Sequence, residues 1–189
     1  IKIDQNLRDF YSKRMAGLTP GTTGADTCSI CNEAAIIATK SGGEYVDIKH
    51  LENAIDRMIL GNRLSQKLSD KEKKIVSIHE SGHAIVSWFL VHTFPILKIS
   101  IVPRGQALGV NQFLPSEDKL YSKLQLVDYM TSILAGRAAE ELIIGSISTG
   151  ASDDLQKVTE LAYKQVGVFG MDEDIGLIAF PSLQRKFSD

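Results

Sequence analysis

The sequence is poor in the features that mark several large classes of protein. Two cysteines in 189 residues are too few for a disulfide framework. The net charge is −2 and no long basic run occurs, so nothing indicates binding to DNA or RNA. The longest apolar run, Ala84 to Leu90, is far too short to cross a bilayer, and no signal-peptide pattern is present. What remains is a globular chain, 43% hydrophobic, with enough apolar residues for one domain or for one domain and a small neighbour.

The two cysteines form a C-x-x-C pair, Cys28 and Cys31. A redox motif would follow a strand in a βαβ unit, and a structural zinc site would need a second pair of ligands. Neither context is present, and both residues lie in a helix-like run from 25 to 39, where residues three apart share a face. We predict packing cysteines in a reducing compartment.

Two of the four histidines lie in the sequence His79-Glu80-Ser81-Gly82-His83, an H-E-x-x-H motif. Residues four apart lie on one face of a helix, so His79 and His83 can direct two imidazole nitrogens at one point. Glu80 is displaced by about 100° around the helix, where it would flank a bound metal and accept a proton from a water molecule. The motif predicts a zinc hydrolase; a pair of core histidines on an ordinary helix is the alternative.

Helix caps and apolar periodicity predict a mainly α fold. The expected helices cover 1–15, 25–39, 47–61, 69–89, 122–142 and 152–166. Ser69 and Ser122 are expected to begin their helices with capping boxes, and Asp47 and Ser152 are expected to be N-caps. The first three should form a small bundle, followed by a polar linker over 62–68. In the motif helix we expect one buried face made by Ile75, Ile78, Gly82, Ile85, Val86 and Phe89.

A short β element is expected beside the motif helix. Residues 97–102 alternate and are β-rich, and residues 109–114 can pair back as a second strand. An open edge on this hairpin would hold an extended peptide through main-chain hydrogen bonds. An ordinary core hairpin is the other interpretation. Residues 175–180 are expected to form a short β-like tail.

A catalytic zinc needs a third protein ligand, which spacing alone does not identify. Phe89 occupies the position of a third histidine six residues after the second, and His50 and His92 have no spacing argument. The acidic candidates are Glu117, Glu140, Glu141, Asp153 and Asp154. Glu140 or Glu141 could instead form a structural ion pair within its helix. Asp153 and Asp154 could instead stabilise the N-terminus of their helix. Physical reasoning leaves both pairs open.

Several motifs, taken in order, resemble the FtsH family of membrane-anchored, ATP-dependent zinc metalloproteases. They are the H-E-x-x-H motif, Ile101-Val102-Pro103-Arg104-Gly105, the run Ala135–Glu141 and the run Ser148–Leu155. Upstream, Leu18-Thr19-Pro20-Gly21 and Cys31-Asn32-Glu33-Ala34-Ala35 resemble the lid of that family's AAA ATPase module. The resemblance covers almost the whole chain and is nearest to the mitochondrial matrix-facing, paraplegin-like (m-AAA) members.

The resemblance implies roles for particular residues. His79, His83 and Asp154 would bind Zn²⁺, Glu80 would be the catalytic general base, and Glu140 would be a supporting carboxylate. The position before the third ligand is often Asn in the family and is Asp153 here, which places a second acid beside the first.

The resemblance also implies a domain organisation. Residues 1–62 would be the C-terminal part of the AAA ATPase lid subdomain, and residues 63–189 the zinc metalloprotease domain, truncated at its C-terminus. The sequence has no G-x-x-x-x-G-K-[ST] loop, so ATP is expected only in the full-length protein. We therefore expect a fragment of a longer subunit, cut at both ends.

The expected partners are unfolded polypeptide substrates and like subunits in a homo- or hetero-hexamer, with membrane anchoring through segments outside this chain. The expected location is the matrix face of the mitochondrial inner membrane; a bacterial or plastid membrane is the alternative. Two other functions stay open at this stage. One is a zinc peptidase of another clan with a Glu as third ligand, and the other is a non-catalytic interaction domain that retains the motif.

Overall fold

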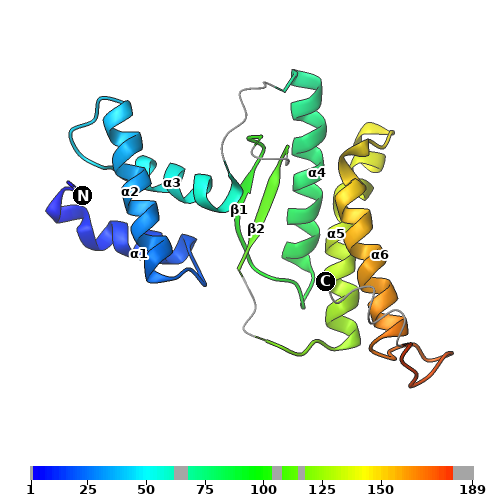
Figure 1. Cartoon of the computed structure of the whole chain (residues 1–189). Coiled ribbons are helices and arrows are strands. Elements are labelled where there is room, and N and C mark those ends of the chain that lie inside the picture. The colour runs from blue at the N-terminus through cyan, green and yellow to red at the C-terminus, as the bar shows by residue number, and fades with distance from the viewer. Residues whose placement is uncertain (1, 62–67, 104–107, 115–117, 181–189) are drawn as a thin grey trace. The chain divides into compact units, whose positions relative to one another are not determined.

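The computed structural model describes residues 2–61, 68–103, 108–114 and 118–180. The chain divides into two compact units, one formed by Ile1–Lys67 with Val102–Leu108 and the other by Leu68–Ile101 with Gly109–Asp189. Within the described residues there are six α-helices and one two-stranded sheet, which confirms the predicted mainly α fold (Figure 1).

The first unit is a small helical bundle with an apolar core. A short 3-10 helix, Gln5–Leu7, precedes α1 (Arg8–Leu18), α2 (Gly24–Lys40) and α3 (Ile48–Leu60). Capping boxes at Thr23 and Asp47 start α2 and α3. The buried core consists of Tyr11, Leu18, Ile30, Ala34, Ala38, Val46, Leu51, Ala54 and Ile55. The assignment of residues 1–62 to an ATPase lid stays a prediction. The linker expected over 62–68 lies outside the described residues except for its last residue.

The expectation that both cysteines pack is wrong for one of them. Cys31 is half-buried, but Cys28 is exposed on α2, and both thiols are free. Residues three apart are still about 60° apart around a helix. One side chain of the pair therefore reaches the edge of the core while the other faces solvent.

The second unit is built on three long helices that lie side by side: α4 (Asp70–Phe89), α5 (Lys123–Ile144) and α6 (Ser152–Gly167) (Figure 1). Capping boxes at Ser69 and Ser122 begin α4 and α5, as predicted. A Cβ on Gly82 would lie 2.4 Å from the backbone oxygen of Ala135. Only glycine lets the two helix backbones approach so closely.

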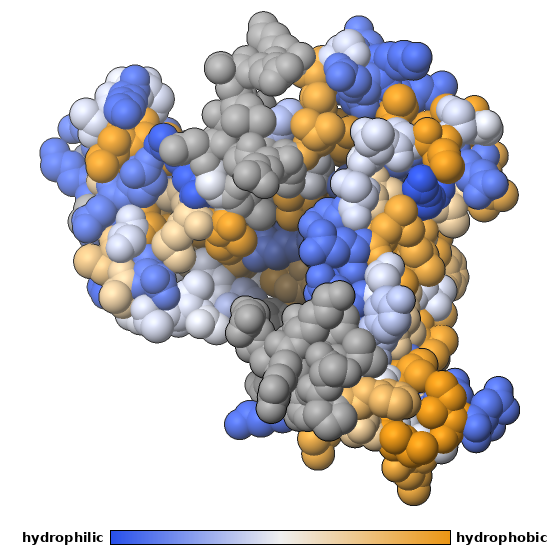
Figure 2. All heavy atoms as spheres, turned by 45° about the vertical axis from the view of Figure 1, so that its right-hand side comes forward, coloured by the Kyte–Doolittle hydropathy of each residue, from blue (hydrophilic) through white to orange (hydrophobic). Residues whose placement is uncertain are grey.

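The apolar face predicted for α4 is wrong in its second half. Ile85 and Phe89 are 58% and 80% exposed, whereas His79, Glu80, Gly82, His83 and Ser87 are buried. Because α5 approaches α4 at Gly82, the polar motif side of α4 turns inward and its apolar C-terminal side turns outward. Hydrophobic side chains accordingly reach the surface among hydrophilic ones over the helices of this unit (Figure 2). Among the described helices, none combines the length and hydropathy that a bilayer crossing requires.

The predicted hairpin consists of β1 (Ile96–Ser100) and β2 (Val110–Phe113), which pair antiparallel. Ile99 pairs with Asn111 and Ser100 with Val110. The first strand ends two residues earlier than expected, and its use as a peptide-binding edge stays a prediction.

The expected β-like tail at 175–180 is wrong, because this segment contains no strand. Asp172 accepts hydrogen bonds from the backbone N–H groups of Asp174 and Ile175, which folds the chain into a turn. The N–H of Phe180 then donates to the carbonyl of Gly167 at the end of α6.

Candidate metal centre

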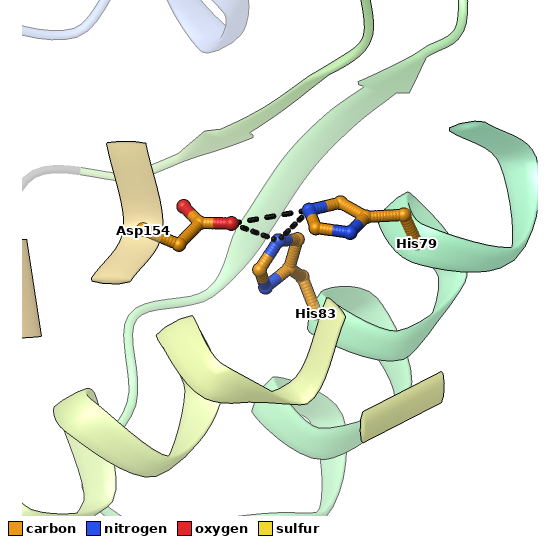
Figure 3. Close-up of side chains that lie close together, drawn as sticks. All are labelled: His79, His83 and Asp154. Carbon is orange, nitrogen blue, oxygen red and sulfur yellow. Dashed lines mark hydrogen bonds and ion pairs between the residues drawn. The ribbon is translucent and has the colours of Figure 1, made fainter. Parts of the chain in front are cut away.

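Helix α4 presents His79 and His83 on its buried side, and the start of α6 presents Asp154 opposite them (Figure 3). The Oδ2 atom of Asp154 lies 3.1 Å from Nε2 of His79 and 3.2 Å from Nε2 of His83. The two Nε2 atoms are 3.0 Å apart. Three potential ligand atoms from residues up to 75 positions apart in the sequence thus form a small triangle.

The other nitrogen of each imidazole fixes which tautomer is present. Nδ1 of His79 lies 2.7 Å from the carboxylate oxygen Oε1 of Glu140, and Nδ1 of His83 lies 2.8 Å from the backbone oxygen of Ser132. Since carboxylates and carbonyls only accept hydrogen bonds, both Nδ1 atoms must carry a proton. In the neutral ring, Nε2 of each histidine is then unprotonated and carries a lone pair. Both lone pairs are available to bind one cation.

The triangle has the dimensions of a zinc site. Ligands held tetrahedrally at about 2.0–2.1 Å from Zn²⁺ stand about 3.3 Å apart. The observed edges of 3.0–3.2 Å are close to that spacing. Two imidazoles and one carboxylate also match the donor set of catalytic zinc sites, which keep a fourth position for water.

Glycine at position 136 makes room for the triangle. A Cβ at Gly136 would lie 2.5 Å from Nε2 of His83 and 2.6 Å from Nε2 of His79, inside van der Waals contact. At this point α5 therefore presents only its backbone, without a side chain, to the two histidines. The same glycine leaves a space at the two lone pairs that any side chain would fill.

Asp154 belongs to the first turn of α6, which starts differently from the prediction. Ser152 is the first residue of the helix and does not cap it; a 3-10 turn, Thr149–Ala151, leads in and is itself capped by Ser148. Burial would raise the pKa of Asp154, but the hydrogen bonds with His79 and His83 outweigh it and hold that pKa well below its usual range. The carboxylate is therefore ionised, as a metal ligand must be.

Asp153, the other member of the acidic pair, points away from the triangle. Its Oδ2 lies 2.6 Å from Nζ of Lys157, one turn along α6, and its side chain is largely exposed. The pKa of Lys157 is raised chiefly by this bond. The extra acid is thus neutralised on the helix surface.

Glu140 lies behind His79 and does not face the point where the Nε2 atoms meet. It is almost fully buried, at 1% exposure, and its Oε2 atom accepts a hydrogen bond of 2.7 Å from the backbone N–H of Ser148. Burial would raise the pKa of Glu140, but the bonds with Ser148 and His79 outweigh it and lower the pKa. For His79, burial alone would lower the pKa, and the bonds with Asp154 and Glu140 outweigh it and raise the pKa.

The remaining candidates from the sequence lie elsewhere. Glu141 is exposed on α5, and Glu117 lies outside the described residues. His92 is exposed. His50 belongs to the capping box of α3.

Glu80 is 8% exposed, and burial raises its pKa. The side-chain amide of Asn111, on β2, donates to Oε2 of Glu80 at 2.7 Å and to the backbone oxygen of Glu80 at 3.0 Å. Just before that strand, a Cβ at Gly109 would lie 2.5 Å from Oε1 of Glu80. The hairpin therefore confines the carboxylate from two positions.

Sequence reasoning missed three contributors to this centre: the carbonyl of Ser132, Gly136 and Asn111. A backbone carbonyl carries no signal in the sequence. Asn111 occupies an ordinary strand position, and its contact depends on the packing of the hairpin against α4. For Gly136, the available signal is its group of small neighbours, Ala135, Ala138 and Ala139, which permits close helix packing but does not identify the partner.

Comparison with known proteins gives consistent matches along the chain. Residues 66–188 match the model of peptidase family M41. A rice protein named ATP-dependent zinc metalloprotease FTSH 3, mitochondrial, is 49% identical over 189 residues, which cover 99% of this chain and 23% of the rice protein. The mouse mitochondrial inner membrane m-AAA protease component AFG3L2 is 48% identical over 182 residues, 95% of this chain and 23% of the mouse protein.

A bacterial protein shows the same degree of similarity. The ATP-dependent zinc metalloprotease FtsH of Rhodothermus marinus is 50% identical over 168 residues, which cover 88% of this chain and 24% of that protein. The chain thus spans about a quarter of the length of the curated relatives it matches.

Proposed function

The chain belongs to peptidase family M41, which agrees with its resemblance to FtsH proteases, and we propose that it is the zinc-dependent endopeptidase part of a longer ATP-dependent protease. The observation that carries the proposal is the triangle of His79 Nε2, His83 Nε2 and Asp154 Oδ2, with edges of 3.0–3.2 Å. Its size and donor set fit Zn²⁺, and Glu80 lies on the same helix beside it.

In the proposed mechanism His79, His83 and Asp154 hold the metal and Glu80 moves the proton. Bound Zn²⁺ supplies a Lewis acid that polarises the scissile carbonyl and acidifies water. Glu80 accepts a proton from the attacking water and returns it to the leaving amine. The buried position of Glu80, which raises its pKa, suits a group that must both take up and release a proton near neutral pH.

Glu140 has a supporting role in this proposal. It accepts the Nδ1 proton of His79 and so holds Nε2 towards the metal. The alternative in which Glu140 is itself the third ligand is disfavoured, because its two oxygens already bind Nδ1 of His79 and the N–H of Ser148. The non-catalytic alternative is disfavoured by Glu80, which a purely structural metal site does not need.

The names of the relatives support a proposal about partners and location. Some of these relatives are named ATP-dependent zinc metalloproteases, several of them mitochondrial, and three others are named components of the mitochondrial inner membrane m-AAA protease. We propose that this chain acts on unfolded polypeptides within a hexamer of like subunits at a membrane, facing the mitochondrial matrix. ATP binding and membrane anchoring would belong to the rest of such a subunit.

Replacing Glu80 by Gln tests the proposal. Loss of a general base should lower peptide turnover by roughly 10²–10⁴-fold, while metal content stays unchanged because Glu80 is not a ligand. The matched control is Glu141→Gln, an exposed glutamate on α5. A Glu80→Gln protein with unaltered turnover of an unstructured peptide would refute the catalytic assignment.

A further inference from the structure

The clearest unexplained polar contact in the second unit joins β2 to the H-E-x-x-H helix. Asn111 donates two hydrogen bonds to a single residue, one to the Oε2 atom of Glu80 at 2.7 Å and one to its backbone oxygen at 3.0 Å. Oε2 and the backbone oxygen of Glu80 are both acceptors. The amide nitrogen of Asn111, and not its oxygen, must therefore face Glu80, which fixes the orientation of the amide. The contact therefore joins a neutral amide donor to the carboxyl group of Glu80.

The amide oxygen of Asn111 indicates that this side chain lowers the stability of the fold. The Oδ1 atom of Asn111 is buried and has no hydrogen-bond partner. A buried acceptor without a partner costs free energy that an alanine or valine at the same strand position would not cost. Stability alone therefore does not account for asparagine at this position.

The backbone just before β2 lies close to the second carboxylate oxygen of Glu80. The backbone at Gly109 comes so close that a Cβ there would lie 2.5 Å from Oε1 and 2.8 Å from Cγ of Glu80. No described side chain hydrogen-bonds to Oε1, whereas Oε2 is occupied by Asn111. The two oxygens of Glu80 are therefore distinguished, with one held by the hairpin and one left for another partner.

We infer that Asn111 is a positioning residue for Glu80: its amide anchors Oε2 so that Oε1 is directed to the water that Glu80 deprotonates. The inference rests on the proposed role of Glu80 as general base. A catalytic carboxylate must be held within about 0.5 Å of its productive position. A glutamate side chain on a helix has three rotatable bonds. The hydrogen bond from Asn111 to Oε2 restricts them without adding a charge, and the bond to the backbone oxygen of Glu80 keeps the amide in place.

Kinetics of Asn111→Ala and Asn111→Asp test the inference. Asp keeps the shape of Asn but has no N–H to donate. Both variants should lower kcat roughly tenfold or more, as expected for the loss of a hydrogen bond to a charged group, with KM and metal content unchanged. The control is Gln112→Ala, which removes an amide from the neighbouring, opposite-facing position of β2. Full kcat in Asn111→Asp would mean that Asn111 only fills space and would overturn the inference.

A double substitution separates this inference from the proposed function. With Glu80→Gln already in place, adding Asn111→Ala should cause no further loss, because there is no base left to position. An additional tenfold loss would mean that Asn111 acts on something other than Glu80. If Glu80→Gln alone keeps turnover, the proposed function fails, and the inference fails with it. If Glu80→Gln is inactive but Asn111→Ala is fully active, only the inference fails.

A spectroscopic measurement is independent of activity. In the ¹⁵N-labelled chain, the side-chain NH₂ signals of Asn111, identified by their loss in Asn111→Asp, should shift in Glu80→Ala. The NH₂ signals of Gln112 should stay in place. Asn111 signals that do not respond to Glu80→Ala would show that the contact does not form in solution and would overturn the inference.

Discussion

The two units of this chain bury different kinds of side chain. Among the described residues, nine of the twelve buried hydrophobic side chains belong to the first unit, and all seven buried polar or charged ones belong to the second. The second unit also exposes large apolar side chains such as Trp88, Phe89 and Leu142, which are 79%, 80% and 82% exposed. The interior of the first unit is apolar, whereas the interior of the second contains the polar residues of the proposed metal site. Buried polar groups stabilise a fold only when they are fully paired, so the stability of the second unit should depend on its hydrogen bonds and on metal binding.

The largest stability effect is expected from a core substitution in the first unit. Leu51 is 2% exposed, so Leu51→Ala should lower the free energy of unfolding by about 2–5 kcal/mol. Ile59, on the same helix but 40% exposed, provides the control, and Ile59→Ala should cost much less. Unfolding in urea followed by circular dichroism measures both. Equal costs would mean that α3 does not pack as described.

In the second unit, a large effect on zinc affinity is expected from a substitution of Glu140. Glu140→Gln keeps the volume but removes the charge that holds Nδ1 of His79. Zinc affinity should fall by roughly 10–100-fold, the usual effect of removing such a partner. Competition with a chromogenic chelator measures the change. Glu141→Gln, one residue along and exposed, should bind zinc as the unaltered chain does; an equal loss there would indicate a general charge effect.

The pH should affect the metal-free and the zinc-bound chain in opposite directions. The pKa of His79 is raised above its ordinary 6.5, so its paired, protonated form stabilises the metal-free fold fully below that value. This contribution is lost as the pH rises through the raised pKa. Zinc binding requires neutral His79, so zinc affinity should rise over the same interval. Thermal unfolding of both forms between pH 6 and 9 checks this, and parallel pH profiles would contradict it.

At low pH, the stability of the metal-free fold is limited by the protonation of Asp154 and Glu140. The pKa values of Asp154 and Glu140 are lowered from 3.8 and 4.5, so their stabilisation is fully present above these values. It is lost as the pH falls through the lowered pKa values. The metal-free second unit should therefore be most stable between about pH 5 and 6.5, below the ordinary pKa of histidine and above those of the acids.

The smallest effect is expected from the exposed apolar side chains of the second unit. Trp88 is 79% exposed, so Trp88→Ser should change the free energy of unfolding by no more than about 0.5 kcal/mol. The same urea titration measures it. A loss comparable to that of Leu51→Ala would mean that this end of α4 is buried against another part of the protein.

Local signals in the sequence predicted the elements that depend on neighbouring residues. The capping boxes at Ser69 and Ser122 and the cap at Asp47 are formed as expected, because a cap involves residues only three positions apart. The apolar face predicted for α4 is wrong in its second half. Ile85 and Phe89 are spaced as a buried face, but the contact that decides which side turns inward is the approach of α5 at Gly82.

In the metal centre too, only the contacts between residues close in sequence could be predicted from spacing. His79 and His83 could be paired from their spacing, since one turn of helix sets their relation. Asp154 was chosen by family resemblance, and its 3.1 Å contact joins residues 75 positions apart. No periodicity within a single helix contains that information. Asn111 was not predicted at all, because its contact with Glu80 depends on how the hairpin packs against α4.

Zinc stoichiometry tests the central claim most directly. Atomic emission on the purified chain should give about one zinc ion per chain. Asp154→Ala should lose most of it, whereas Asp153→Ala, which only breaks the surface pair with Lys157, should keep it. Full zinc in the Asp154→Ala chain, or loss in the Asp153→Ala chain, would contradict a centre formed by His79, His83 and Asp154.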